Sequence, residues 1–144
     1  MQRRDLIRFT FAGAVSGTFV PRALFASPTS DDSNPMAGSV FFTKDAPGRW
    51  RGKEASHLPQ IEIEKKSDGI SVKVSTPHEV SGFDHYIIKH ILLDGNYGLL
   101  GEKMFNPLKD KAAISTFSLS KYNGPIYALS VCNKHDTWLS SAEV

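Results

Sequence analysis

The chain has 144 residues, enough for one domain, with a formal net charge of +2, five histidines and one cysteine. Residues 1–26 alone carry a net charge of +3, which leaves −1 for residues 27–144. A nucleic-acid surface needs Lys and Arg clustered on the folded domain, so this distribution argues against a nucleic acid as partner. A single cysteine also excludes an internal disulfide. It suggests a free thiol, an intermolecular bridge or a metal thiolate.

The first 26 residues predict an export signal. Arg3 and Arg4 lie in a positively charged start, residues 10–20 form a short apolar stretch, and a cleavage site is expected after Ala26. The paired arginines resemble the twin-arginine signal, which carries folded proteins across the bacterial inner membrane, and a general secretory signal is the alternative. The apolar stretch is too short to span a bilayer as a helix, so we expect a periplasmic protein without a stable membrane anchor.

Beyond the signal, the chain first predicts a linker and then a β-hairpin. Residues 27–37 are polar and aperiodic, which indicates a flexible linker and places the folded domain at residues 38–144. A first short strand is expected at residues 39–43. Apolar and polar residues then alternate at 61–64 and at 70–74, on either side of a turn at 66–69, and this pattern predicts the hairpin.

The C-terminal half predicts further strands and no long helix. Strands are expected at residues 85–93, 114–119 and 125–132, with turn sequences at 94–98 and 123–124. No segment has the pattern of a long amphipathic helix. Six or seven short strands in a chain of this length predict an all-β fold, namely an antiparallel β-sandwich with no second domain.

Four of the five histidines lie at predicted strand ends or in loops, where a sandwich can gather side chains into one site. They are His57, His78, His85 and His135, and the last follows both the final predicted strand and Cys132. Imidazole and thiolate together favour late first-row transition metals over Mg²⁺ or Ca²⁺. Four imidazoles and one sulfur exceed the four ligands of a structural zinc site, and they suit five-coordinate iron with an open sixth position.

Three segments that contain these residues are similar to motifs of a known family. They are His57-Leu58-Pro59 before a strand, His78 followed by His85-Tyr86-Ile87, and Tyr-Ala-Leu-Ser-Val-Cys-Asn-x-His-x-x-Trp at residues 127–138. Their order and character resemble the superoxide reductases, a group also called neelaredoxin or the iron domain of desulfoferrodoxin. The likeness extends from about Gly48 to Glu143.

The resemblance implies an immunoglobulin-like β-sandwich that holds one mononuclear iron, cycling between Fe²⁺ and Fe³⁺. His57, His78, His85 and His135 would be its equatorial ligands, and Cys132 its axial thiolate. Because the chain has no further cysteine, the four-cysteine domain of desulfoferrodoxins would be missing, and this would be a one-iron form.

The activity implied by the resemblance is one-electron reduction of superoxide to hydrogen peroxide. Superoxide would bind opposite Cys132, and backbone amides around Lys134 and His135 would donate hydrogen bonds to the sulfur. The partners implied are superoxide and an external electron donor, either rubredoxin-like or a periplasmic redox carrier. The family also implies a homodimer or a homotetramer.

The sequence departs from the family pattern at two places. Six residues separate His78 from His85 where the family has five, so a longer or bulged loop is expected. The family also has Glu-Lys directly before its first histidine ligand, where this chain has Ala-Ser at residues 55–56. Lys53 and Glu54, two residues earlier, and Lys134, between the last two ligands, are the candidate catalytic residues outside the ligand set.

The fifth histidine, His90, is not expected to bind the metal, and two alternative functions are also compatible with the sequence. His90 lies five residues after His85, which would place it on the opposite face of a strand, so we expect it to be structural. One alternative function is an electron-transfer copper protein of the cupredoxin type, although no methionine follows His135 as an axial ligand. The other is a non-catalytic iron-binding or redox-sensing protein.

Overall fold

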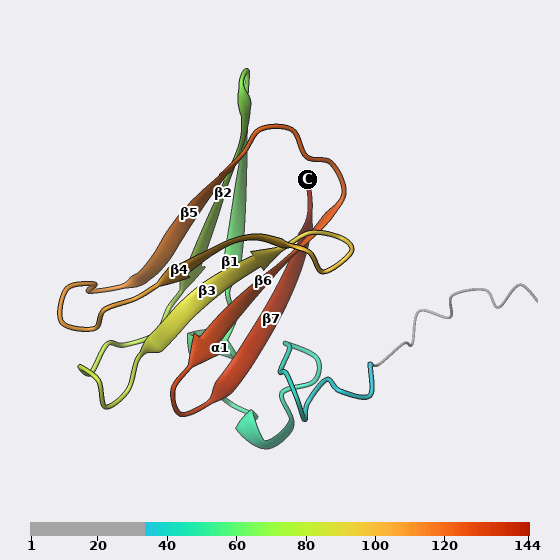
Figure 1. Cartoon of the computed structure of the whole chain (residues 1–144). Coiled ribbons are helices and arrows are strands. Elements are labelled where there is room, and N and C mark those ends of the chain that lie inside the picture. Colours follow the sequence, from blue (N-terminus) through green and yellow to red (C-terminus); the bar gives the residue numbers. More distant parts are fainter. Residues whose placement is uncertain (1–33) are drawn as a thin grey trace, which may run out of the picture. The chain divides into compact units, whose positions relative to one another are not determined.

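The computed structural model describes residues 34–144, which form two antiparallel β-sheets packed as a sandwich (Figure 1). The predicted signal at residues 1–26 and most of the predicted linker lie outside these residues and stay predictions. Residues 34–41 form turns, held by bonds such as that from the amide of Ala37 to the carbonyl of Asn34 at 2.7 Å. Within residues 34–144, no helix is long and apolar enough to cross a membrane.

The seven strands divide into a sheet of three and a sheet of four. The first sheet has the order β1-β2-β5 and consists of β1 (Gln60–Lys66), β2 (Gly69–Thr76) and β5 (Ala113–Leu119). The second has the order β4-β3-β6-β7 and consists of β3 (Ile87–Leu93), β4 (Leu99–Met104), β6 (Pro125–Cys132) and β7 (Asp136–Glu143). Two short helices, η1 (Gly48–Trp50) and α1 (Glu54–His57), precede β1. Every strand pair is antiparallel, and the predicted fold class is confirmed.

The alternating pattern of β2 shows why these sequences form a sandwich. Val72 and Val74 are fully buried between the sheets, whereas Lys73 points outward and pairs with Glu62 of β1 at 3.2 Å. Burying one such aliphatic side chain contributes about 1.5–3 kcal/mol. The same core includes equally buried apolar residues of β3 and β6, namely Leu92, Ile126 and Ala128.

The hairpin predicted from residues 61–74 is confirmed as β1 and β2, and the predicted strands at 114–119 and 125–132 correspond to β5 and β6. The strand expected at 85–93 begins at Ile87 instead, because His85 pairs with Ser81 in an isolated bridge of the preceding turn. Two strands, β4 and β7, were not predicted. The large apolar residues in these strands stand next to each other and do not alternate with polar ones, and pairing with β3 and β6 supplies the order that the local pattern does not indicate.

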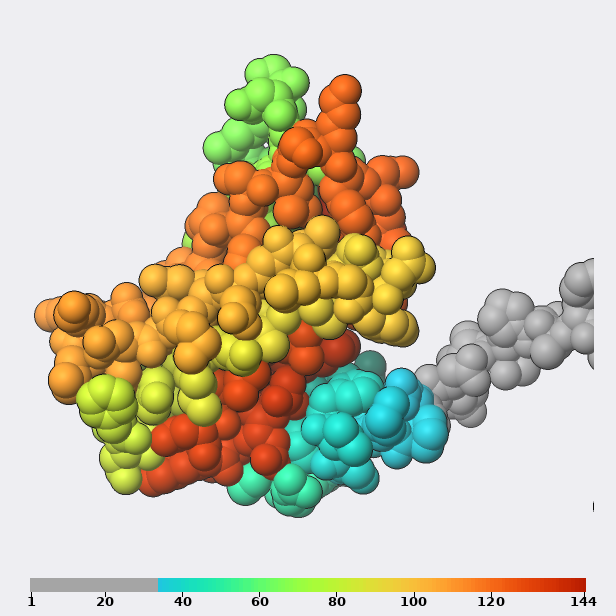
Figure 2. All heavy atoms as spheres, in the orientation of Figure 1, coloured from blue at the N-terminus to red at the C-terminus, as the bar shows by residue number. Residues whose placement is uncertain are grey.

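The strand predicted at residues 39–43 is wrong, since this segment forms only isolated bridges. Phe41 forms a bridge with Ala37, and Phe42 pairs with β7: the amide of Phe42 donates to the carbonyl of Thr137 at 2.9 Å, and its carbonyl accepts from the amide of Leu139 at 2.8 Å. Figure 2 shows the blue-green atoms of this region against the red atoms of the C-terminal strands. The contact fixes the segment that leads to η1 and α1 beside β7.

Candidate metal centre

Five side chains meet at one end of the sandwich. His57, His78, His85, His135 and Cys132 each present one ligand atom, and all five atoms lie within 4.8 Å of one another. The structure therefore brings together every residue that was predicted to bind metal.

The five ligands come from five different segments, each at or next to the end of a helix or strand. His57 is the last residue of α1, His78 follows β2, and His85 lies in the loop before β3. Cys132 ends β6, and His135 lies in the tight turn between β6 and β7. The expectation that His135 follows the last strand was wrong, because β7 continues from residue 136. The turn is therefore braced by strands on both sides.

Three consecutive pairs of imidazole nitrogens have the spacing expected for neighbouring corners of a square of ligands. His57 Nε2 lies 2.9 Å from His135 Nδ1, His135 Nδ1 lies 3.0 Å from His85 Nε2, and His85 Nε2 lies 3.0 Å from His78 Nε2. Corners 3.0 Å apart lie about 2.1 Å from the centre of a square, which is the usual metal–imidazole distance. The sulfur of Cys132 lies 3.6 Å from His135 Nδ1 and 3.8 Å from His78 Nε2.

The electrostatics of the cluster also fit a metal ion. Burial, followed by the neighbouring His78, lowers the pKa of His57 to about 4, against the opposing effect of the Lys53 carbonyl. Burial is likewise the first cause that lowers the pKa of His78, His85 and His135. Neutral imidazoles whose lone pairs face one another repel, so a cation at the centre stabilises this arrangement. The donor set of four neutral nitrogens and one sulfur suits iron.

The ring nitrogens Nδ1 of His57 and His78, which are not in contact with the other ligand atoms, differ in their hydrogen bonds. His57 Nδ1 lies 3.1 Å from the carbonyl of Lys53 and 2.8 Å from the hydroxyl of Ser56, which itself donates to the same carbonyl at 3.1 Å. A proton on Nδ1 donates to these oxygens and leaves Nε2 free to bind metal. By contrast, His78 Nδ1 is buried and makes no hydrogen bond of normal geometry, although the backbone of Glu79 acts against the lowering of its pKa.

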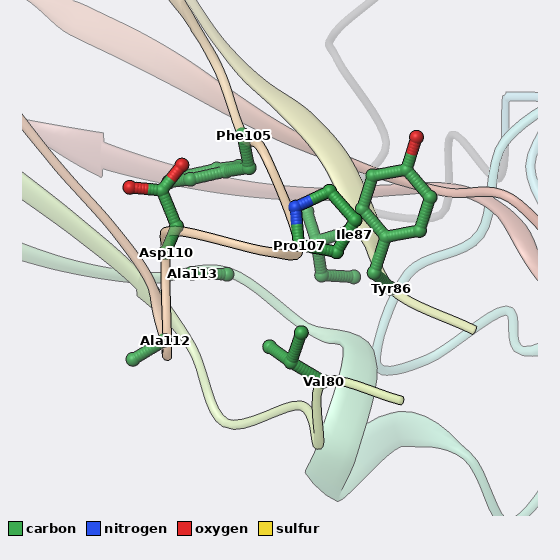
Figure 3. A pocket seen from close by; sticks show the side chains of 8 residues that line it. All are labelled: Val80, Tyr86, Ile87, Phe105, Pro107, Asp110, Ala112 and Ala113. Atoms are coloured by element: carbon green, nitrogen blue, oxygen red, sulfur yellow. The ribbon is translucent and has the colours of Figure 1, made fainter. Parts of the chain in front are cut away.

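The thiol is protected by burial and by the chain that follows it. Cys132 is 3% exposed and packs in an apolar cluster with Ile87, Phe105 and Ala113. The amide of Lys134 donates to its sulfur at 3.5 Å, which is one of the hydrogen bonds predicted for this region. Figure 3 shows a small pocket beside this cluster, and none of the five ligands lines it.

Asn133 explains how His85 reaches the site despite the long spacer. Its side-chain oxygen accepts from the amide of Tyr86 at 3.1 Å, and its side-chain nitrogen donates to the carbonyls of Phe83 and Asp84 at 3.2 and 3.0 Å. Its own amide donates to the carbonyl of Tyr86 at 3.2 Å. Four bonds from one residue thus hold the loop on both sides of His85.

His90 lies in the core as expected for a structural residue, and it is fully buried. Its Nε2 lies 2.9 Å from the hydroxyl of Thr76, and its Nδ1 lies 2.8 Å from the hydroxyl of Ser115. Thr76 also donates to Ser130 at 2.8 Å. Since the Thr76 proton is used there, His90 donates from Nε2. The low pKa of the ring keeps it neutral at pH 7, so Nδ1 accepts from Ser115. Burial lowers its pKa to about 4.

The three predicted catalytic residues lie around the cluster in different settings. The ammonium groups of Lys53 and Lys134 both lower the pKa of His85 and of His135, so both charges act on this side of the cluster. Lys134 also pairs with Asp84 at 3.1 Å. Glu54 accepts from the amide of Gly52 at 2.7 Å, and its carboxylate is not part of the five-donor group.

Two residues at the site, Trp50 and Asp136, were not predicted from the sequence, whereas Trp138 belongs to the C-terminal motif. The ring of Trp50 packs edge-on against His135 with centroids 4.6 Å apart, and its indole nitrogen donates to Asp136 at 2.7 Å. The indole of Trp138 donates to the carbonyl of His135 at 2.9 Å. Asp136 directly follows the ligand His135, and this acidic residue was a signal visible in the sequence. Its partner Trp50, however, lies 86 residues away in the chain.

Comparison with known proteins agrees with this geometry. A family model described as desulfoferrodoxin matches residues 49–141. The chain is 33% identical over 109 residues to a superoxide reductase from Pyrococcus abyssi, covering 67% of this chain and 92% of that protein. It is 34% identical over 103 residues to a superoxide reductase from Thermococcus kodakarensis, covering 63% and 87% respectively.

A solved structure shows the same similarity in three dimensions. A variant of the superoxide reductase (neelaredoxin) from Ignicoccus hospitalis superimposes with a TM-score of 0.64 at 30% identity. The superposition covers 74% of this chain and 94% of that one. The sandwich and the segments that carry the five ligands therefore lie within the shared part of the chain.

Proposed function

The chain belongs to the desulfoferrodoxin family, and on that premise we propose that its five-donor cluster holds one mononuclear iron with which it reduces superoxide. The observation that carries this function is the convergence of four imidazoles and one thiolate. The protein is a superoxide reductase: superoxide takes up one electron and two protons and leaves as hydrogen peroxide. When bound, ferrous iron supplies that electron.

The protein's own residues give the site two unlike sides. Cys132 is buried, whereas His85 and His135 are partly exposed. A small anion therefore reaches the cluster from the side of His85 and His135. The Cys132 thiolate and the four imidazoles would hold the ion. The hydrogen bond from the Lys134 amide stabilises negative charge on the sulfur. Solvent at the open side supplies the two protons.

Lys53 is the side chain best placed to attract superoxide. Its charge acts on both His85 and His135, and no ion pair of Lys53 is found among residues 34–144. Lys134 acts on the same two histidines, but its pairing with Asp84 offsets part of its charge. Glu54 is bonded to the turn before α1, so we assign it to that turn and not to the metal.

Metal analysis and pulse radiolysis test the function together. We expect about one iron per chain, a broad thiolate-to-iron absorption band in the red for the oxidised protein, and faster superoxide decay with the ferrous protein. Intense blue absorption with bound copper would instead support a cupredoxin-like carrier, which needs two histidines where this cluster presents four. Bound iron without faster decay would support the non-catalytic sensor.

The electron donor is proposed to be an external one-electron carrier, either rubredoxin-like or periplasmic. The partly exposed His85 and His135 support direct contact with such a carrier. Re-reduction of the ferric protein, followed at the red band with purified candidates, distinguishes them. We also propose a homodimer or homotetramer, as the family likeness implies, and light scattering measures the mass against the 15.9 kDa chain.

Periplasmic location is proposed from the first 26 residues, where Arg3 and Arg4 precede an apolar stretch. Cys132 is buried, and its sulfur accepts a hydrogen bond from the Lys134 amide. This shielding of the sulfur is compatible with an oxidising compartment. Fusing residues 1–30 to a reporter and changing both arginines to lysine should retain the reporter in the cytoplasm. Export that is unaffected by this change would favour the general secretory route.

A further inference from the structure

A group of side chains joins the segment before α1 to the turn that carries His135. The indole of Trp50 donates to Oδ2 of Asp136 at 2.7 Å, and the guanidinium of Arg49 donates to the same oxygen. That guanidinium also lies 5.5 Å from the centroid of the Trp50 ring and 5.1 Å from that of Phe42. We call Arg49, Trp50 and Asp136 the clasp. It links positions that are 86 and 87 residues apart.

One end of the clasp fixes the backbone of Lys53. The amide of Lys53 donates to the carbonyl of Trp50 at 2.9 Å, which closes a four-residue turn. Arg51 has φ −50° and ψ 130°, and Gly52 has φ +91°, which are the angles of a type II turn with glycine at its third position. The bond from the Gly52 amide to Glu54 completes the turn. Holding Trp50 therefore holds Lys53.

The other end of the clasp lies beside a metal ligand. Asp136 follows His135 directly and has φ +60°, a backbone region that few residues other than glycine adopt. Asp is one of the residues that tolerate it. The carboxylate is thus presented toward Trp50, whose ring already packs edge-on against His135. The clasp thus joins the turn that ends at Lys53 to the segment that carries His135.

We propose that the clasp is a positioning device that holds the Lys53 ammonium beside the exposed side of the metal centre and so sets the rate at which a small anion is captured. This inference rests on the proposed function. Its geometry stands on the two bonds to Asp136, the closed turn and the ring contact. In support, the carbonyl of Lys53 lies 3.1 Å from Nδ1 of His57, which places this turn directly beside a ligand of the cluster.

The hydrogen bond from the Trp50 indole to Asp136 contributes more to positioning Lys53 than the ion pair between Arg49 and Asp136 does. The side chains of Arg49 and Asp136 are 58% and 40% exposed, and exposed ion pairs hold geometry weakly. The indole, by contrast, has a single donor with a fixed direction, and it donates to a charged oxygen. Trp50 is also the only clasp residue that belongs to the turn itself.

The kinetic test uses four variants of the full, iron-loaded chain: Lys53→Ala, Asp136→Gly, Asp136→Asn and the double variant Lys53→Ala/Asp136→Gly. Glycine suits φ +60° and preserves the turn while removing the carboxylate, and asparagine keeps one oxygen for the indole. The second-order rate with superoxide is measured by pulse radiolysis at low and high salt. Lys65→Ala, at the far end of β1, is the matched control for loss of one positive charge.

We expect Lys53→Ala to lower the rate about 3- to 10-fold at low salt and to flatten its salt dependence, since one charge contributes a part of electrostatic steering. Asp136→Gly should lower the rate similarly, although it removes a negative charge and would otherwise favour an anion. Asp136→Asn should recover part of the loss. The double variant should be no slower than either single variant, and Lys65→Ala should change little.

Hydrogen exchange of the same proteins gives a readout that does not depend on turnover. Asp136→Gly should speed exchange at the amides of Gly52 and Lys53 and leave the amides of β2 unchanged. Equal effects of Lys53→Ala in the wild-type and Asp136→Gly backgrounds, or unchanged exchange in the turn, would overturn the proposal. If the wild-type ferrous protein fails to speed superoxide decay, the proposed function and the capture role fall, while exchange still decides whether the clasp holds Lys53.

Discussion

The stability of the fold should depend on pH through His90. This ring is fully buried, donates to Thr76 and accepts from Ser115, and its pKa is lowered by burial to about 4 from an ordinary value of 6.5. The folded state therefore favours the neutral ring, and the unfolded state binds more protons at mildly acidic pH. Stability from His90 is complete above pH 6.5 and is lost as pH falls toward 4.

The size of the effect follows from the two pKa values. Linkage predicts a loss of about 2 kcal/mol in the free energy of unfolding between pH 7.5 and pH 5, and about 3 kcal/mol once the pH is below 4. The comparison protein is His90→Gln, which stays neutral and keeps one donor and one acceptor. Urea unfolding of both proteins, each at pH 7.5, 6 and 5, measures the two slopes under identical metal loading.

The difference between the two slopes isolates His90, because the four cluster histidines titrate alike in both proteins. We expect the stability advantage of the wild type over His90→Gln to shrink by about 2 kcal/mol between pH 7.5 and pH 5. Parallel curves, within about 0.5 kcal/mol, would refute the buried neutral ring and with it the assigned direction of the bonds to Thr76 and Ser115.

Three further changes test the metal centre and its supports. Cys132→Ser should abolish the red absorption band and superoxide reduction while far-UV circular dichroism stays near wild type; an unchanged band would exclude the thiolate as a ligand. Asn133→Ala should lower metal affinity about 10- to 100-fold in chelator competition by freeing the loop of His85, with Asn123→Ala as control, and equal affinities would contradict the loop argument. Gly52→Ala should cost about 1–2 kcal/mol in urea unfolding, since φ is +91° and nothing lies within 4 Å of the added methyl group; no cost would contradict the type II turn.

The departure from the family pattern at residues 55–56 has a structural role in this chain. Ser56 hydrogen-bonds to both the Lys53 carbonyl and His57 Nδ1, so it helps to orient the first ligand. We propose that Lys53, four positions before His57, takes the role of the lysine that the family places directly before this histidine.

The ligand set and much of the fold could be predicted from the sequence because they depend on local chemistry. Alternation with period two indicates strands such as β1 and β2, and residue type alone limits which side chains bind a soft metal ion. Cys132 and His135, three residues apart in one turn, are neighbours whatever the rest of the chain does. Their membership of the site therefore followed from the sequence motif.

Only the tertiary structure decided which distant residues complete and support that site. β4 and β7 have weak local patterns and are ordered by pairing with β3 and β6, so the position of His135 between two strands was not visible in the sequence. The contact of Trp50 with Asp136 spans 86 residues and depends on how the N-terminal segment packs against β7. Long-range packing sets such contacts, and no short window of sequence contains both partners.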